Sequence, residues 1–262
     1  MADSIFTPSG DGRFTPTEHA RGPWDPNALH GGAPAALIAR AFERVEPGAE
    51  LPIARLGFEL LKPIPFAPLT VATRIVRKGR RVQELSAELR AGEELICRAS
   101  ALRIQPVPGG LPSGGPAPAA AMPGPEHGEE TRFALNKSAG ASLATTGMEM
   151  SWLTDPWDLG PGRVWMRLRH PLLPDEPATG LTRLVATADF GNGVSAELPF
   201  DEYLFINADL TIHLWRAPRG EWIGLDAHTL LHDGGMGMAE SVLHDTSGPV
   251  GRAFQTLVVQ PR

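Results

Sequence analysis

The two halves of this chain repeat the same pattern of apolar residues, and this repeat limits the folds that the chain can adopt. A constant offset of 154 residues lays the alternating apolar run 56–60 on the run 210–214, and the Arg-Ala pair at 98–99 on the pair at 252–253. Strict alternation of apolar side chains is typical of a β-strand with one buried face. The near-gapless register therefore predicts a duplicated β-rich domain.

A segment rich in Pro, Gly and Ala separates the two copies. It covers residues 106–126, and no apolar periodicity continues through it. Such a composition is typical of a linker. We therefore expect an N-terminal domain at residues 1–105 and a C-terminal domain at residues 127–262, each long enough to form a core of its own.

Each copy is expected to contain one helix followed by several strands. Residues 33–45 are rich in helix formers and place Leu37, Ile38 and Phe42 on one face, and residues 179–190 form the second helix. The expected strands cover residues 53–61, 69–78, 81–90 and 94–105 in the first copy, and 205–215, 222–232, 236–244 and 251–260 in the second. Because the sheet must cover its apolar helix, the pattern predicts an α+β fold.

Composition and charge exclude several classes of partner. The formal net charge is -6 at pH 7 and basic residues are spread along the chain, so neither nucleic acid nor an anionic membrane surface is expected as a partner. No uninterrupted apolar run approaches the roughly 18 residues that cross a bilayer. Residues 1–10 lack the pattern of a signal peptide, and the single cysteine, Cys97, cannot form an internal disulfide. We therefore expect a soluble, cytoplasmic protein.

The sequence does not favour a covalent nucleophile, a metal or a cofactor. No Gly-x-Ser-x-Gly motif occurs, and Cys97 lies in a strand-like run without a nearby partner. His228 and His232 are four residues apart, but on a strand this spacing places them on one face too far apart to share an ion. We therefore expect neither a serine or cysteine nucleophile nor a metal or cofactor.

Two groups of residues resemble a known family. The run Leu-His-Gly-Gly at 29–32 precedes the first helix; the second half has Asp189 at the end of its helix, the strand 222–229, the turn 245–248 and Gln255 in the last strand. In these features the chain resembles the hotdog superfamily, in particular the tandem double-hotdog acyl-CoA thioesterases of the TesB type. The resemblance implies two tandem hotdog domains, each an antiparallel sheet wrapped around one central helix. It also implies an acyl-CoA substrate, a place in fatty acid metabolism, and pairing of chains into a homodimer or higher homo-oligomer.

The resemblance also implies roles for three residues of the second half. Water attacks the thioester directly in this family, which makes Asp189 the general base, Thr229 the orienting hydroxyl and Gln255 the orienting amide. Thr229 requires a one-residue slip, because a gapless alignment places Leu230 at the hydroxyl position. Each residue also has a structural interpretation: Asp189 could close its helix, Gln255 could face solvent, and Thr229 has ordinary strand propensity.

The run at 29–32 has two interpretations. His30, Gly31 and Gly32 could form an oxyanion hole, because glycines allow close approach of a ligand and amides at a helix N-terminus stabilise negative charge. The same residues could form only a tight turn into the helix, with His30 packed or capping.

Two other functions remain open from the sequence. Asp25 and His30 have the Asp-x4-His spacing of hotdog enoyl-CoA hydratases, in which both residues activate water for addition to a double bond. A duplicated hotdog could also bind acyl-CoA or another apolar ligand without turnover. Thioester hydrolysis separates the enzyme from the binding protein, and enoyl-CoA hydration identifies the hydratase.

Overall fold

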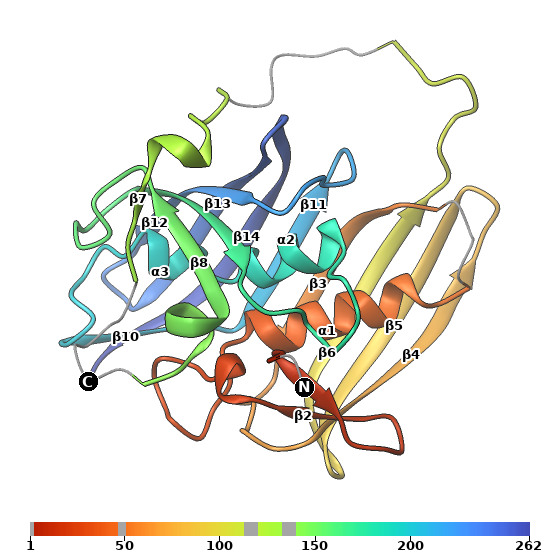
Figure 1. Cartoon of the computed structure of the whole chain (residues 1–262), viewed down its shortest axis with the longest axis horizontal. Coiled ribbons are helices and arrows are strands. Elements are labelled where there is room, and N and C mark those ends of the chain that lie inside the picture. Colours follow the sequence, from red (N-terminus) through yellow and green to blue (C-terminus); the bar gives the residue numbers. More distant parts are fainter. Residues whose placement is uncertain (1–2, 47–50, 113–119, 133–139) are drawn as a thin grey trace.

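The computed structural model describes residues 3–46, 51–112, 120–132 and 140–262. In these residues the strands form one 14-stranded sheet, and the two longer helices lie side by side against one of its faces (Figure 1). The first strands are β1 (Phe6–Pro8), β2 (Arg13–Pro16), β3 (Ile53–Leu60), β4 (Leu69–Lys78), β5 (Val82–Ala91), β6 (Glu94–Ile104) and β7 (Glu129–Glu130). The others are β8 (Met148–Trp152), β9 (Gly162–Leu168), β10 (Tyr203–Asn207), β11 (Asp209–Leu214), β12 (Ile223–Leu231), β13 (Met236–Asp245) and β14 (Gly248–Pro261).

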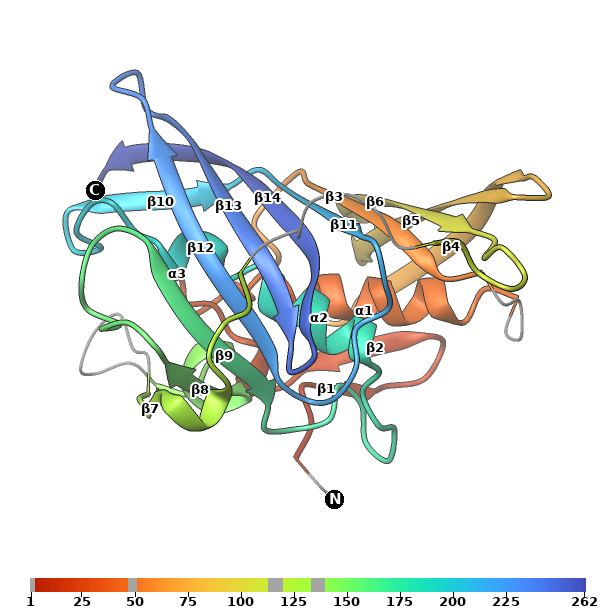
Figure 2. The ribbon, with the colours of Figure 1, turned by 90° about the horizontal axis from the view of Figure 1, so that it is seen from above.

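The two halves join edge to edge in the middle of this sheet. Antiparallel pairing of β3 with β11 places Leu56 opposite Ile212, and the strands run in the order β4-β5-β6-β3-β11-β14-β13-β12 across the junction. Each half therefore contributes one antiparallel sheet to a continuous surface, seen from above in Figure 2. The α+β prediction of two tandem hotdog domains is confirmed.

The helices are α1 (Gly32–Glu43), α2 (Gly180–Ala188) and the short α3 (Gly191–Val194), and further helical turns cover Glu18–Ala20, Pro125–His127 and Leu143–Gly147. The helices α1 and α2 are antiparallel, because the residues at the start of each one contact the end of the other. A Cβ atom on Gly32 would lie 2.5 Å from the carbonyl oxygen of Ala186, so this glycine permits close packing of the helix pair. No helix in the described part of the chain is long and apolar enough to cross a membrane.

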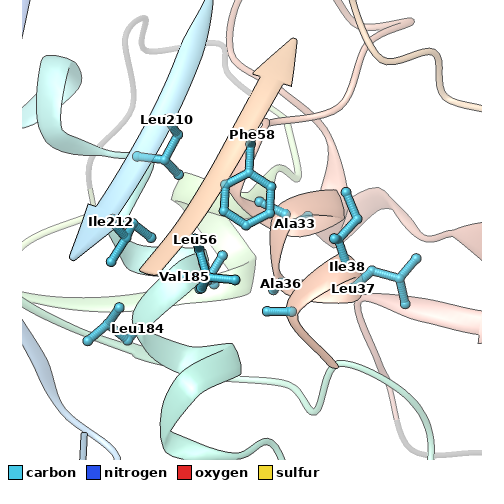
Figure 3. Packing of buried hydrophobic residues seen from close by; sticks show 14 of the residues in the cluster. Ala33, Ala36, Leu37, Ile38, Leu56, Phe58, Leu184, Val185, Leu210 and Ile212 are labelled. Atoms are coloured by element: carbon cyan, nitrogen blue, oxygen red, sulfur yellow. The ribbon is translucent and has the colours of Figure 1, made fainter. Parts of the chain in front are cut away.

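The core lies between the helix pair and the central strands. Apolar side chains of both helices contact those of β3 and β11 in Figure 3, and all of the labelled residues are buried. Burial of each large apolar side chain is worth about 1.5–3 kcal/mol relative to exposure. The labelled residues are Ala33, Ala36, Leu37, Ile38, Leu56, Phe58, Leu184, Val185, Leu210 and Ile212.

The structure differs from the sequence-based expectation in two places. The strand expected at 205–215 is divided into β10 and β11, because the register with β14 shifts by one residue around Ala208. The strands β1, β2, β7, β8 and β9 were not expected; they have two to seven residues each and lie toward the edges of the sheet. Residues 113–119 of the expected linker lie outside the described residues, and the domain boundaries stay a prediction.

Candidate active site

Asp189 lies where the end of α2 meets the start of α1. It is the C-cap residue of α2 and is 5% exposed. Its Oδ2 lies 3.0 Å from His30 Nδ1, and its Oδ1 accepts a 2.9 Å hydrogen bond from Asn207 Nδ2. A carboxylate is disfavoured at a helix C-terminus, because the helix dipole places negative charge there. These side-chain partners, rather than the helix, therefore hold Asp189.

Gln255 of β14 is the second hydrogen-bond donor to Asp189 Oδ1. The side chain is buried, and its Oε1 accepts the backbone N–H of Asn192 at 3.0 Å. This bond fixes the orientation of the amide, so Nε2 faces Asp189 and donates to its backbone oxygen at 3.0 Å and to Oδ1 at 3.4 Å. Gln255 therefore points into the site and not into solvent.

Asn207 is a site residue that the sequence analysis missed. It ends β10 at the register shift around Ala208, and a β-bulge of this kind redirects the side chains beside it. The shift brings the Asn207 amide to Asp189. A signal was present in the sequence, because Asn is depleted in strands and lies here within an apolar run.

His30 connects the two helices through its ring. The ring stacks on Phe190 with a centroid distance of 4.1 Å, and the side chain is 10% exposed. Its Nδ1 lies 3.0 Å from Asp189 Oδ2 and 3.1 Å from the backbone nitrogen of Gly32. One nitrogen cannot donate to the carboxylate and accept from the amide at once. The tautomer that donates to Asp189 therefore releases the Gly32 N–H.

The glycines at the start of α1 are required by space rather than by an unusual backbone angle. Gly31 has a φ of -57°, which any residue adopts. A Cβ atom there would lie 2.8 Å from Asp189 Oδ2, closer than such contacts occur. Gly31 therefore lets the carboxylate lie directly against the N-terminus of α1, where backbone amides favour negative charge.

Thr229 of β12 lies apart from this group. Thr229 pairs with Ala239 of β13, and Ala239 pairs with Gln255 of β14. Two strand spacings of about 4.8 Å therefore separate Thr229 from Gln255. The Thr229 hydroxyl is buried and lies 2.8 Å from Ser195 Oγ. Because Ser195 Oγ donates to the Gly191 carbonyl at 2.9 Å, Thr229 is the donor of this bond. The structure thus brings together Asp189, Gln255, His30, Gly31, Gly32 and Asn207, and it leaves Thr229 two strands away from Gln255.

Other candidate residues have different surroundings. Asp25 is exposed, and its carboxylate accepts the backbone N–H of Asn27 at 2.8 Å, whereas the carboxylate that faces His30 is that of Asp189. Cys97 is a buried free cysteine, and burial raises the pKa of its thiol to about 12. Such a thiol is not a nucleophile at neutral pH.

Known proteins resemble the chain along most of its length. The sequence model of the acyl-CoA thioesterase N-terminal domain matches residues 20–104, and that of the acyl-CoA thioesterase C-terminal domain matches residues 117–259. A search of curated proteins finds no match.

Solved structures share the fold at low sequence identity. A hotdog-fold protein from Alicyclobacillus acidocaldarius superposes with a TM-score of 0.75 at 15% identity, covering 97% of this chain and 95% of that one. The tesB protein of Mycobacterium avium subs paratuberculosis gives 0.68 at 15% identity, covering 98% and 96%. An acyl-CoA thioesterase II of Mycobacterium marinum gives 0.64 at 17% identity, covering 94% and 96%. With both family domains matched in order along one chain, the protein belongs to the acyl-CoA thioesterase family of thioester hydrolases.

Proposed function

We propose that this protein hydrolyses a fatty or other acyl-CoA thioester by direct attack of water, with Asp189 as the general base. The observation that carries this proposal is a buried carboxylate held by two carboxamides and one histidine against the N-terminus of α1. A carboxylate whose orientation is fixed by donors can accept a proton from water without forming a covalent intermediate.

The steps of the reaction use these groups in turn. Asp189 accepts a proton from water while the water oxygen attacks the thioester carbonyl carbon. Negative charge then develops on the carbonyl oxygen, and the Gly32 N–H at the start of α1 can stabilise it once His30 Nδ1 donates to Asp189. The C–S bond breaks, the acid product leaves, and the proton passes from Asp189 to the CoA thiolate.

The glutamine and asparagine amides would position the carboxylate rather than exchange protons. Both donate to Oδ1, so Oδ2 is the oxygen that faces His30 and the glycines. In this proposal Thr229 supports α3 through Ser195, and Asn207 takes the orienting role that the resemblance gave to a hydroxyl.

The test is hydrolysis of a panel of acyl-CoAs of increasing chain length, measured by release of free thiol. Asp189→Asn keeps the size of the side chain and removes the base, so we expect kcat to fall by about 10²–10⁴-fold. Asp25→Asn is the matched control, because Asp25 is exposed and bonded within its own loop. It should retain the wild-type rate.

Other outcomes distinguish the remaining functions. Binding of acyl-CoA without cleavage by the wild type would favour a binding protein. Hydration of enoyl-CoA that is lost in Asp25→Asn would favour the hydratase. Cleavage that survives Asp189→Asn would place the base elsewhere.

Three further properties are proposals of the same kind. We expect the protein to act in the cytoplasm, consistent with Cys97 being its single cysteine and a free thiol. We also propose that residues 106–126 connect two domains and that whole chains associate into homo-oligomers. Limited proteolysis and light scattering test these two points.

A further inference from the structure

A second group of chemically active side chains lies outside the site around Asp189. Asp3, His19 and His170 come from three distant parts of the sequence: the N-terminal segment, the helical turn Glu18–Ala20 and the segment after β9. One ring nitrogen of each histidine and one carboxylate oxygen of Asp3 all lie within 4.8 Å of one another. Asp3 is exposed, whereas both histidines are half-buried.

Thr146, in the turn Leu143–Gly147, sets the tautomer of His19. Its hydroxyl donates to the Ser142 carbonyl at 3.0 Å and lies 2.8 Å from His19 Nδ1. A hydroxyl has one proton, so His19 Nδ1 must be the donor to Thr146. The lone pair of His19 therefore lies on Nε2, which is available to an ion.

His170 lies next to His19, and the two rings stack with their centroids 4.1 Å apart. Neutral imidazoles whose other nitrogen donates to a protein oxygen are the form in which histidine binds metals.

We propose that Asp3, His19 and His170 bind one divalent transition-metal ion, with zinc as the ion that best fits. Two imidazoles and one carboxylate are ligands that zinc accepts, and a water molecule can complete a tetrahedral site. Tetrahedral bonds of about 2.0–2.1 Å bring ligand atoms to about 3.3 Å from one another. The rings now stack with centroids 4.1 Å apart, so small ring rotations and movement of the exposed Asp3 side chain close the group around the ion.

The ion would connect three segments that already contact one another. The Ile5 N–H donates to the Pro171 carbonyl at 3.0 Å, directly beside Asp3 and His170. Next to His19, the Ala20 carbonyl accepts the His30 backbone N–H at 3.0 Å. The metal would therefore fix the turn that supports His30 without contacting the reacting atoms, and the proposal does not depend on thioesterase activity.

The experiment titrates zinc into the untagged, chelator-treated full chain by calorimetry, with the cobalt absorption spectrum as a report on ligand geometry. We expect one equivalent to bind, with visible cobalt bands of a four-coordinate site and a rise in Tm on addition of zinc. Asp3→Asn and His170→Gln should each weaken zinc binding by at least about 10-fold and remove the rise in Tm. Circular dichroism checks that both variants fold.

His232→Gln is the matched control. His232 is exposed and lies 2.9 Å from Asp233, so it also offers a histidine beside a carboxylate. The control should bind zinc as the wild type does. The proposal is overturned by a wild type that binds no stoichiometric zinc, by unchanged binding in Asp3→Asn and His170→Gln, or by binding that His232→Gln removes.

Discussion

The two ends of the α1 and α2 pair have the same architecture and different chemistry. At one end Asp189, at the end of α2, meets His30 at the start of α1. At the other end Glu43, at the end of α1, accepts a 2.8 Å hydrogen bond from the hydroxyl of Thr179, the N-cap of α2. An acid therefore lies beside a helix start at both ends.

The neighbours of the two acids differ. The offset that relates the halves lays Asn207 on Ile53 and Gln255 on Ala101, so neither amide has a counterpart in the first half. Arg103 occupies this region instead, with bonds to the Val45 carbonyl at 2.8 Å and to the Phe42 carbonyl. Both carbonyls lie at the end of α1, where a helix has few partners of its own, although the Phe42 carbonyl also accepts the Val45 N–H at 3.2 Å.

The difference supports the proposal that chemistry takes place at the Asp189 end. Burial raises the pKa of Glu43, although the Thr179 hydroxyl and the nearby Arg103 act in the opposite direction. Ile53 and Leu214 line a cavity of about 410 Å³ beside it, and among the residues that the structure describes no carboxamide bonds to this acid. The Asp189 end therefore has a carboxylate oriented by several donors. The Glu43 end has Arg103, which caps α1.

Among the variants that test the difference between the two ends, Gly31→Ala should have the largest effect on activity. Gly31 is the N-cap of α1, and a Cβ atom there would push against Asp189 Oδ2. A displacement of about 1 Å in a reacting group can cost 10²-fold in rate, so we expect kcat to fall by about 10²–10³-fold in the thiol-release assay. Gly193→Ala is the control, because nothing lies within 4 Å of its Cβ position. Equal rates for both variants would mean that close approach of Asp189 to α1 is not needed.

Arg103→Leu should act on folding and not on catalysis. The substitution removes the guanidinium donor from the Val45 carbonyl and the Gln83 amide oxygen in a buried region, whereas the Phe42 carbonyl keeps the Val45 N–H. We expect the free energy of unfolding to fall by about 2–4 kcal/mol in a urea titration. The activity of the folded variant should stay within twofold of the wild type. A large loss of kcat in the folded protein would contradict the separation of roles between the two ends.

Asn207→Ala tests whether the amides define the active end. Loss of one of the two donors to Oδ1 should lower kcat by about 10-fold, equivalent to about 1.4 kcal/mol of the barrier. Gln255→Ala should behave similarly, and the double variant should show coupling because both amides bond one oxygen. Ile53→Ala, at the corresponding position of the first half, should leave kcat unchanged. A strictly additive double variant would argue against joint orientation of Asp189.

The sequence predicted the parts of this site that depend on local pattern. Alternating apolar residues identified the central strands, whereas Asp189 was identified through the family resemblance. Gln255 was found through the resemblance, and the structure turns its side chain toward Asp189. Asn207 could not be predicted in the same way, because its position depends on a register shift among β10, β11 and β14.

Thr229 shows a further limit of pattern-based inference. The sequence placed Thr229 in a strand, but a strand prediction does not specify how many strands separate its buried side chain from Gln255. The strand order places β13 between them. The cluster of Asp3, His19 and His170 was missed for a similar reason, because long-range pairing of the N-terminal segment brings these residues together.

Glu43→Gln should have the smallest effect and the most specific pH dependence. Because its pKa is raised from 4.5, the folded state holds the Glu43 proton more tightly than the unfolded chain does. Its contribution therefore favours the folded state below about pH 4.5 and is lost as the pH rises through the raised pKa. The glutamine side chain of the variant stays neutral as the pH rises, so the variant does not lose this contribution. At pH 7 it should therefore be more stable than the wild type, by only about a few tenths of a kcal/mol because Glu43 is only partly buried. Urea titrations at pH 4 and pH 7 measure the difference, which should shrink at the lower pH, while thioesterase activity stays unchanged. A loss of activity comparable to that of Asp189→Asn would mean that both ends of the helix pair take part in the reaction.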